Sequence, residues 1–201
     1  RNDMDHLPPP PQVMWGLINS NVLARCVQVV SEYGVADAIG DGSRTSSEIA
    51  ARTGMDEDAL ARMLRLLTAH GVFEQENGSY KNSPLSELLR SDHPQSMRSF
   101  ARMMNLPVFL ESFAGLTETA KTGKPVKSFA EFMEYFAANP DQSSLFNAAM
   151  ADKSRAVVPA VLAEYDFSPF NVIADIGGGR GHLVRGVLER TPNASGRLYD
   201  L

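Results

Sequence analysis

A glycine-rich turn between two regular elements constrains the fold of this sequence more than any other feature. An apolar run over residues 172–175 ends in Asp175, and Ile176 leads from it into Gly177-Gly178-Gly179-Arg180-Gly181. Apolar residues then recur at helical spacing up to Pro192: Leu183, Val184, Val187 and Leu188. The pattern predicts a buried strand, a tight turn whose backbone can approach a ligand closely, and a helix.

A second short strand is predicted over residues 197–200, with Asp200 at its C-terminal end. In a doubly wound sheet, a carboxylate at this position faces the ribose of a bound nucleoside. Residues 169–201 are therefore predicted to be the first β-α-β unit of an α/β, Rossmann-like domain.

The spacing of the glycines indicates which nucleoside-containing cofactor the turn would bind. A dinucleotide fingerprint, G-x-G-x-x-G, needs a small residue at position 182, where this sequence has His182. Asp175, Gly177, Gly179 and Gly181 instead give D-x-G-x-G-x-G, which is typical of methyltransferases that use S-adenosylmethionine (SAM). SAM has no pyrophosphate to cradle, so the turn needs only to pass flat beneath an adenosine and a methionine tail. An ordinary flexible turn is the alternative.

Composition narrows the function classes without choosing one. The 201 residues carry a formal net charge of −5, which argues against a general nucleic-acid binder. The single cysteine, Cys26, allows no internal disulfide and favours a reducing cytoplasm. The apolar stretch over residues 13–30 is interrupted by Asn19, Asn21, Arg25 and Gln28, so no membrane span or signal peptide is expected. No metal site is expected either.

The first 110 residues are predicted to form a helical, winged-helix domain. A helix over residues 13–33 is followed by a short one over 36–39, and Ser46 or Ser47 is expected to cap the next. Asp56 opens a further helix that ends at Gly71, and two strands flank the hairpin turn Asn77-Gly78. Helix, turn, helix and hairpin make a winged helix.

A winged helix raises the possibility of a transcriptional regulator. The candidate recognition helix, however, opens with Asp56, Glu57 and Asp58, which would set carboxylates against bases and phosphates. Acidic residues in a first turn are ordinary partners of the helix dipole. We therefore expect a structural, dimerising module with no nucleic-acid partner. Apolar residues on several faces of the first helix, including Trp15, Leu23 and Val27, predict that it and helices within residues 94–121 form an interlocked homodimer.

The middle of the chain is helical and rich in Met and Phe. Residues 111–168 are predicted to be a helical linker that also contributes to a pocket. Most of these side chains are expected to form helix cores, although Met and Phe also suit a pocket for a flat aromatic ring.

Nearly the whole chain resembles the plant caffeate-type and bacterial small-molecule O-methyltransferases. The resemblance rests on the glycine motif and on upstream stretches: Leu23-Ala24-Arg25-Cys26-Val27, Tyr33-Gly34-Val35-Ala36-Asp37, Leu64-Arg65-Leu66-Leu67, Glu134-Tyr135-Phe136-Ala137 and Phe146-Asn147-Ala148-Ala149-Met150. It implies a mainly α winged-helix dimerisation domain followed by a SAM domain, a homodimer, and methyl transfer from SAM to a small aromatic hydroxyl, in the manner of bacterial secondary metabolism.

The resemblance also implies residue roles. The backbone of Gly177, Gly179 and Gly181 would contact SAM, Asp175 would hold that loop and the cofactor's ammonium end, and Asp200 would accept hydrogen bonds from both ribose hydroxyls. Phe146 and Met150 match positions near the methyl-transfer cavity, although plain core packing is an alternative for both.

One departure concerns the catalytic base. The family's domain continues well beyond its second strand and uses a histidine base there, whereas His6, His70, His93 and His182 all lie elsewhere. We therefore expect the base beyond Leu201, and the 201 residues to be an inactive N-terminal part of a longer enzyme. A non-catalytic dimeric scaffold with this fold remains open.

Overall fold

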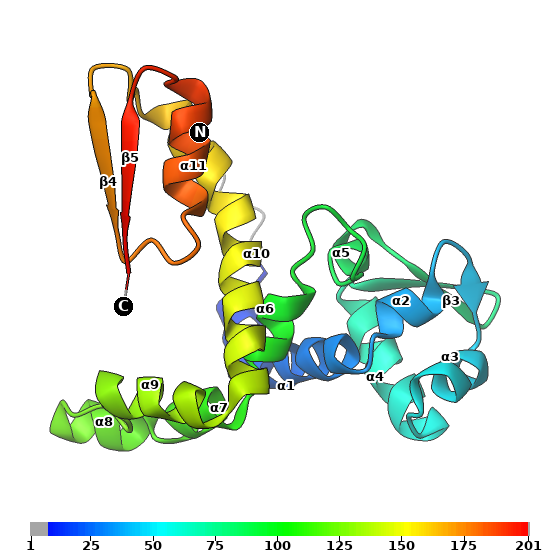
Figure 1. The fold of residues 1–201 in the computed structure, drawn as a ribbon. Helices are drawn as coiled ribbons and strands as arrows, with labels where there is room; N and C mark the ends of the chain where they lie inside the picture. The colour runs from blue at the N-terminus through cyan, green and yellow to red at the C-terminus, as the bar shows by residue number, and fades with distance from the viewer. Residues whose placement is uncertain (1–7, 201) are drawn as a thin grey trace. The chain divides into compact units, whose positions relative to one another are not determined.

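The computed structural model describes residues 8–200, which divide into two compact units, Arg1–Arg90 and Ser91–Leu201. Helices and strands of the first unit are α1 (Pro10–Glu32), α2 (Val35–Ile39), β1 (Ser43–Arg44), α3 (Ser46–Thr53), α4 (Glu57–Ala69), β2 (Phe73–Glu76), β3 (Ser79–Asn82) and α5 (Pro84–Glu87). Those of the second unit are α6 (Arg98–Met103), α7 (Pro107–Ala114), α8 (Leu116–Thr122), α9 (Phe129–Ala138), α10 (Pro140–Glu164), β4 (Val172–Ile176), α11 (His182–Arg190) and β5 (Ser195–Tyr199). Figure 1 labels most of these helices and strands.

The first unit is the predicted winged helix. Helices α3 and α4 lie between β1 and the β2–β3 hairpin in the chain, and the three strands form an antiparallel sheet of order β1-β3-β2. Asn77 and Gly78 both have positive φ, 49° and 81°, which suits a tight hairpin between β2 and β3. The core consists of fully buried apolar side chains from the helices and the hairpin: Val30, Val35, Ile39, Ile49, Leu60, Leu64, Leu67 and Phe73.

One local prediction in this unit is wrong. Neither Ser46 nor Ser47 caps α3, because Thr45 does: its hydroxyl accepts a hydrogen bond from the backbone N–H of Glu48, and the Glu48 carboxylate accepts one from the N–H of Thr45. This reciprocal pair is a capping box, in which the cap residue stands three positions before the glutamate.

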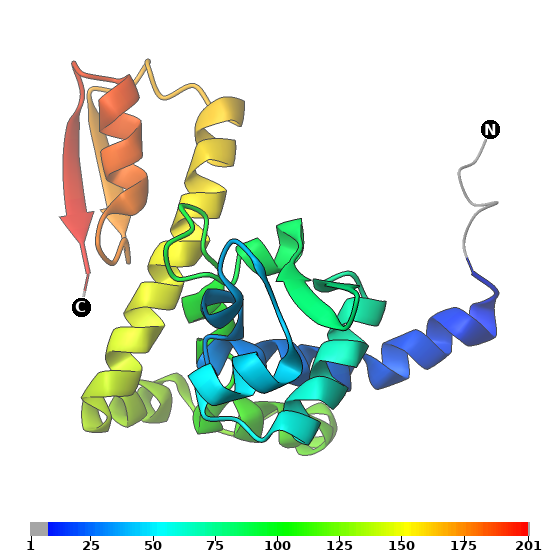
Figure 2. The same ribbon diagram turned by 90° about the vertical axis from the view of Figure 1, so that its right-hand side faces the viewer.

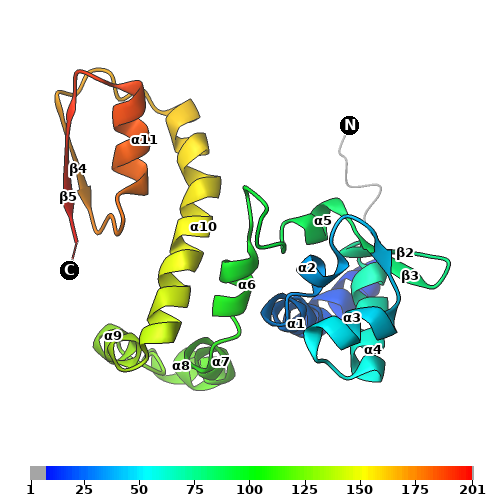
Figure 3. The same ribbon diagram turned by 45° about the vertical axis from the view of Figure 1, so that its right-hand side comes forward.

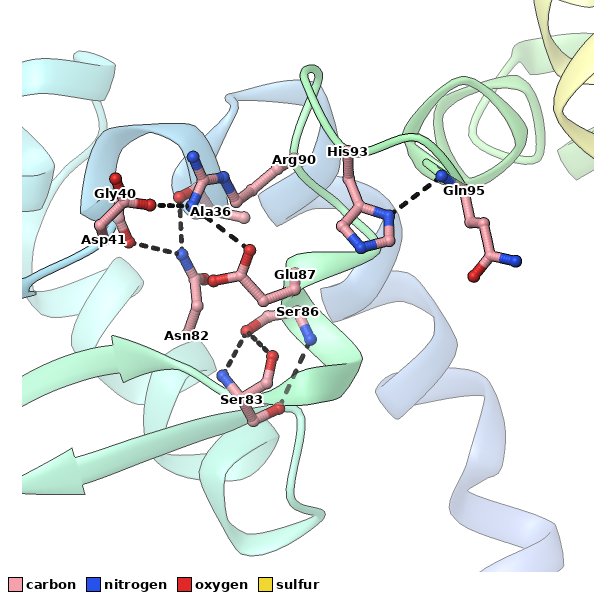
Figure 4. A network of polar contacts seen from close by, with 10 residues as sticks. All are labelled: Ala36, Gly40, Asp41, Asn82, Ser83, Ser86, Glu87, Arg90, His93 and Gln95. Carbon is pink, nitrogen blue, oxygen red and sulfur yellow. Dashed lines mark hydrogen bonds and ion pairs between the residues drawn. The ribbon is translucent and has the colours of Figure 1, made fainter.

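Polar contacts hold the hairpin against α2, as Figure 4 shows. The side-chain amide of Asn82 donates to the backbone oxygens of Ala36 and Gly40, each at 3.0 Å. Arg90 pairs with Asp41 at 2.5 Å and with Glu87 at 3.3 Å. The two Asn82 bonds and the Arg90–Asp41 pair join segments more than 40 residues apart in the chain, so they fix the wing on the helical core.

Helix α1 presents an apolar face to its surroundings. Several large side chains on it are between 40% and 72% exposed: Val13, Met14, Trp15, Leu17, Ile18 and Val22. Figure 2 shows the N-terminal half of α1 extending away from the rest of its unit. Among the described residues, α1 is also long and apolar enough to cross a membrane by length and composition, a test that core helices and signal sequences also pass. The interrupting polar residues therefore do not exclude a span by composition alone.

In the second unit, the long helix α10 packs against α6, α9 and α11. Helix α6 packs along it, and α11 lies between α10 and the parallel strands β4 and β5 (Figures 1 and 3). Gly186 allows the close approach of α11, because an added Cβ would lie 3.0 Å from Val158 Cγ1 and 3.1 Å from Leu162 Cδ1. Strand, helix and parallel strand confirm the predicted start of a methyltransferase-type α/β domain.

Candidate cofactor-binding site

The glycine turn lies at the C-terminal edge of the two parallel strands. Register pairs Ile176 with Tyr199, so Asp200, the residue after β5, stands beside the start of the turn. The N–H of Gly177 donates to the backbone oxygen of Tyr199 at 2.8 Å, which continues the sheet bonding into the turn. In open α/β sheets this carboxyl edge is where ligands bind.

Two glycines in the turn face open space. Gly177 and Gly179 have φ of 73° and 55°, a left-handed backbone conformation that residues other than glycine adopt at a cost in free energy. A Cβ built on either would meet nothing within 4 Å. The backbone is therefore accessible at both positions, so a ligand can approach it closely.

Gly178 and Gly181 have a different environment, which sequence reasoning missed for Gly178. A Cβ on Gly178 would lie 2.4 Å from Asp175 Cγ and 2.5 Å from Leu198 Cδ1, and a Cβ on Gly181 would lie 3.2 Å from Leu198 Cδ2. These two glycines pack the turn onto the strands. The available sequence signal for Gly178 was a glycine at a position of the D-x-G-x-G-x-G pattern where any residue is allowed.

The two carboxylates lie on opposite sides of the turn. Asp200 Oδ2 accepts a hydrogen bond from the N–H of Gly179 at 2.5 Å, and Asp175 Oδ2 accepts one from the N–H of Val184 at 3.4 Å. Asp200 is exposed, whereas Asp175 is half-buried beneath the turn. The structure thus brings together Asp175, Gly177, Gly179, Gly181 and Asp200. Asp200 accepts a hydrogen bond from the turn, and Asp175 accepts one from the first turn of α11.

Phe146 belongs to a separate aromatic cluster, and Met150 lies near it in sequence. They lie one turn apart on α10, and both are half-buried. The ring of Phe146 lies 4.8 Å from that of Phe136 and 6.0 Å from that of Phe132, and Phe132 contacts Phe109 at 5.6 Å. Phe136 is 5% exposed, so this part of the cluster is packed core. The exposed rim includes Phe129, at 70%, and Met133, at 44%.

Three histidines lie within residues 8–200, each in a different part of the structure. His70 ends α4, and His93 lies in the segment before α6. His182 begins α11, where its Nε2 is buried without a hydrogen-bond partner. His6 lies outside the described residues, as does Leu201. Within residues 8–200, no three His, Cys, Asp or Glu side chains are grouped so that they could hold a metal ion.

Comparison with known families agrees with both units. Residues 15–92 match the O-methyltransferase dimerisation domain, and residues 115–201 match the O-methyltransferase domain. The chain belongs to the O-methyltransferase family. The dimerisation match includes α1 from Trp15 onward, which places its exposed apolar face within a domain named for subunit association.

Similar proteins include several O-methyltransferase family members from bacteria. The phenazine O-methyltransferase PhzM of Lysobacter antibioticus is 34% identical over 192 residues, which are 94% of this chain and 56% of that protein. The 8-amino-8-demethylriboflavin N,N-dimethyltransferase of Streptomyces davaonensis is 34% identical, over 89% of this chain and 53% of that protein. The structure of CalO1, a methyltransferase in calicheamicin biosynthesis in its SAH-bound form, aligns with a TM-score of 0.81 at 30% identity, covering 98% of this chain and 60% of that one. The chain thus spans a little over half the length of the relatives it matches.

Proposed function

We propose that this O-methyltransferase-family chain supplies the dimerisation domain and the first part of the SAM site of an enzyme that methylates a hydroxyl of a small aromatic molecule. The observation that carries the proposal is the turn itself. Gly177 and Gly179 leave open space over the backbone, and Asp200 stands at the carboxyl edge of the sheet. The SAH-bound form of CalO1, a relative of the same fold, supports the choice of cofactor.

The residues present fit SAM. The space over Gly177 and Gly179 admits a ligand against the backbone, since a Cβ built on either glycine would meet nothing within 4 Å. A carboxylate has about four lone-pair sites, so Asp200 can keep its bond to Gly179 and accept hydrogen bonds from ribose hydroxyls as well. Asp175 holds the turn in place through α11 and offers negative charge for the ammonium group.

The bound cofactor supplies a methyl group already activated on a sulfonium. What the chain must add is alignment, because holding two reactants in line removes most of the entropic barrier to their reaction. Phe146 and Met150, beside the aromatic cluster of α7, α9 and α10, are proposed to line the acceptor pocket. Flat aromatic acceptors fit Phe and Met walls, and the phenazine and riboflavin named for two relatives are flat ring systems.

An amino group is the alternative acceptor, because one of these relatives is named as an N,N-dimethyltransferase. The two acceptors are distinguished by supplying aminophenol-type compounds and locating the new methyl group on oxygen or nitrogen by NMR. Methylation at oxygen supports the proposal, and methylation at nitrogen alone replaces it with the alternative.

We also propose a cytoplasmic homodimer formed through α1. An exposed row of Trp15, Leu17 and Ile18 is costly in water, and an obligate dimer interface of more than about 2,000 Å² would cover it. Light scattering should give twice the chain mass of 21.9 kDa. Trp15→Glu combined with Ile18→Glu should give monomers, whereas Gln12→Glu on the same helix should not. A monomeric wild-type chain at micromolar concentration contradicts the proposal.

The cofactor site is tested in a polypeptide that carries this chain together with the remainder of the methyltransferase domain. Gly179→Val puts a branched side chain into the open space over the turn and should abolish SAM binding in calorimetry. The dimer should persist, because the helices proposed to form it, α1 and those within residues 94–121, precede Asp175 in the chain. Unchanged SAM affinity would reduce the turn to an ordinary loop and remove the main support for a methyltransferase.

A regulator that reads DNA through α4 is opposed by the structure of that helix. Asp56 is its N-cap, with its carboxylate accepting from the N–H of Ala59 at 2.9 Å, and Glu57 and Asp58 follow in the first turn. These carboxylates occupy the helix end that a winged helix would direct toward the major groove.

A further inference from the structure

Arg180 lies within the glycine turn, and the proposed function gives it no role. It follows Gly179, where a built Cβ would meet nothing within 4 Å, and it precedes Gly181, the N-cap of α11. A residue between these two glycines stands beside the open space over the turn. Arg180 is exposed, so its long side chain can reach a ligand that lies in that space.

The guanidinium group of Arg180 is not committed to another part of the chain. Its side chain makes no hydrogen bond or ion pair with any other residue in the described range, 8–200. The next two arginines along the chain differ: Arg185 lies 3.8 Å from Glu189 Oε1, and Arg190 donates to the backbone oxygen of Leu162 at 2.5 Å. The positive charge of Arg180 is therefore available to a ligand.

The start of α11 adds donors directly after Arg180. The N–H of Val184 donates to Asp175 at 3.4 Å, whereas the N–H groups of His182 and Leu183, the first two residues of the helix, have no partner among the described residues. Free N–H groups and the helix dipole favour an anion at a helix N-terminus. Arg180 thus adds a full positive charge beside a helix end that is already suited to an anion.

We propose that Arg180 binds the methionine carboxylate of SAM, an inference that rests on the proposed function. The methionine end of SAM carries its ammonium group and its carboxylate on one carbon atom, so their two partners must lie close together in the protein. Asp175, proposed for the ammonium group, meets this condition, because its Cγ would lie 2.4 Å from a Cβ on Gly178, two residues before Arg180.

Charge complementarity supports this assignment. The charged residues given a role at the cofactor site so far, Asp175 and Asp200, are both acidic, whereas the methionine end of SAM carries both signs. A guanidinium group binds a carboxylate through two parallel hydrogen bonds, which makes the pair both directional and strong. Arg180 supplies the positive partner that these two carboxylates leave missing.

The test uses the longer polypeptide proposed for Gly179→Val, which carries the remainder of the methyltransferase domain. Calorimetry compares S-adenosylhomocysteine (SAH) with its decarboxylated analogue, which keeps the adenosine, the sulfur and the amine but lacks the carboxylate. The wild type should bind SAH about tenfold or more tightly than the analogue, the effect expected of hydrogen bonds to a charged group. Arg180→Gln should lower the affinity for SAH to that for the analogue and leave the affinity for the analogue unchanged.

The matched control is Arg185→Gln, which removes the same charge from α11, where the side chain is 74% exposed, and should bind both ligands as the wild type does. The proposal is overturned if Arg180→Gln keeps the preference for SAH, which would assign the carboxylate to the helix end alone. It is also overturned if Arg180→Gln weakens both ligands equally, or if the wild type does not distinguish them. Binding of neither ligand by the wild type would refute the proposed cofactor site, and this proposal with it.

A second measurement does not depend on the variants folding. Phenylglyoxal modifies accessible arginines, and mass spectrometry of the wild type locates the adducts. Saturating SAH should slow modification of Arg180 severalfold and leave Arg185 unaffected, whereas the saturating analogue, which covers the same turn, should protect Arg180 much less. Equal protection of Arg180 by the two ligands would show that the cofactor merely covers this side chain, and would overturn the proposal.

Discussion

Substitution by alanine and by asparagine should have different effects at Gly178 and at Gly179, two adjacent glycines of the turn. At Gly178 the obstacle is steric, because a Cβ would lie 2.4 Å from Asp175 Cγ, where ordinary contact begins at 3.4 Å. At Gly179 the space is open, and the obstacle is a φ of 55°. Alanine and asparagine separate the two causes, because asparagine tolerates a left-handed backbone better than alanine does.

The magnitudes follow from these two causes. Gly178→Ala requires its neighbours to retreat by about 1 Å, the difference between 3.4 and 2.4 Å. Overpacking of this kind costs about 1–3 kcal/mol, and the lower half of that range applies because Leu198 is 47% exposed and can yield outward. Gly178→Asn should cost at least as much. Gly179→Ala should cost about 1–2 kcal/mol from backbone strain, and Gly179→Asn noticeably less.

The measurement is amide hydrogen exchange across residues 172–200, which reports the local free energy of opening in this part of the second unit. Exchange across β2 and β3 of the first unit is the internal control and should be unchanged in all four variants. The decisive observation is the rank order, Asn better than Ala at Gly179 but not at Gly178. If asparagine relieved the loss equally at both positions, or if Gly178→Ala were as stable as wild type, the steric account of Gly178 would be refuted.

Three further predictions concern other parts of the chain. Asn82→Ala removes two hydrogen bonds at 3.0 Å and leaves the backbone oxygens of Ala36 and Gly40 without that donor. It should therefore destabilise the first unit by about 1–3 kcal/mol in urea unfolding. Glu76→Ala, at an exposed position, is the control and should change the free energy of unfolding by less than about 0.5 kcal/mol. Hydrogen bonds from the side chain and backbone of Ser128 lower the pKa of Glu131 from its usual 4.5, so the capping box of α9 contributes stability above that value and loses it as pH falls through the lowered pKa. Amide hydrogen exchange in α9, corrected for intrinsic rates, should therefore rise on acidification in the wild type and stay flat in Glu131→Gln. A flat dependence on pH in the wild type would contradict the assignment of this stability to the Glu131 carboxylate. Burial raises the pKa of the Cys26 thiol, so iodoacetamide at pH 8 should alkylate it more slowly in the folded chain than in urea, and equal rates would show that the thiol is freely accessible.

Much of the fold could be predicted from local sequence signals. The hairpin at Asn77-Gly78 needs two residues of positive φ, and asparagine followed by glycine is the pair that best provides them. Asp56 caps α4 as expected, because a short acceptor side chain before an apolar periodic run satisfies the first free N–H groups. The glycine turn was predictable because its signals are also local: a strand, a run of glycines and a helix occupy 19 consecutive residues, from Val172 to Arg190.

Tertiary structure decided what the local pattern could not specify. The Gly179 to Asp200 bond joins residues 21 positions apart and exists only because β4 and β5 pair in parallel. Gly178 is required partly by Asp175, three residues earlier, and partly by Leu198 of the neighbouring strand, and the turn sequence does not specify the contact with Leu198. The hydrogen bond from the N–H of Ser99 to Asp152 depends on the packing of α6 against α10 and joins residues 53 positions apart. Backbone conformation is set mainly by neighbours in sequence, whereas contact with a neighbouring strand depends on which surfaces the folded chain brings together, and the contact of Gly178 with Leu198 is of this second kind.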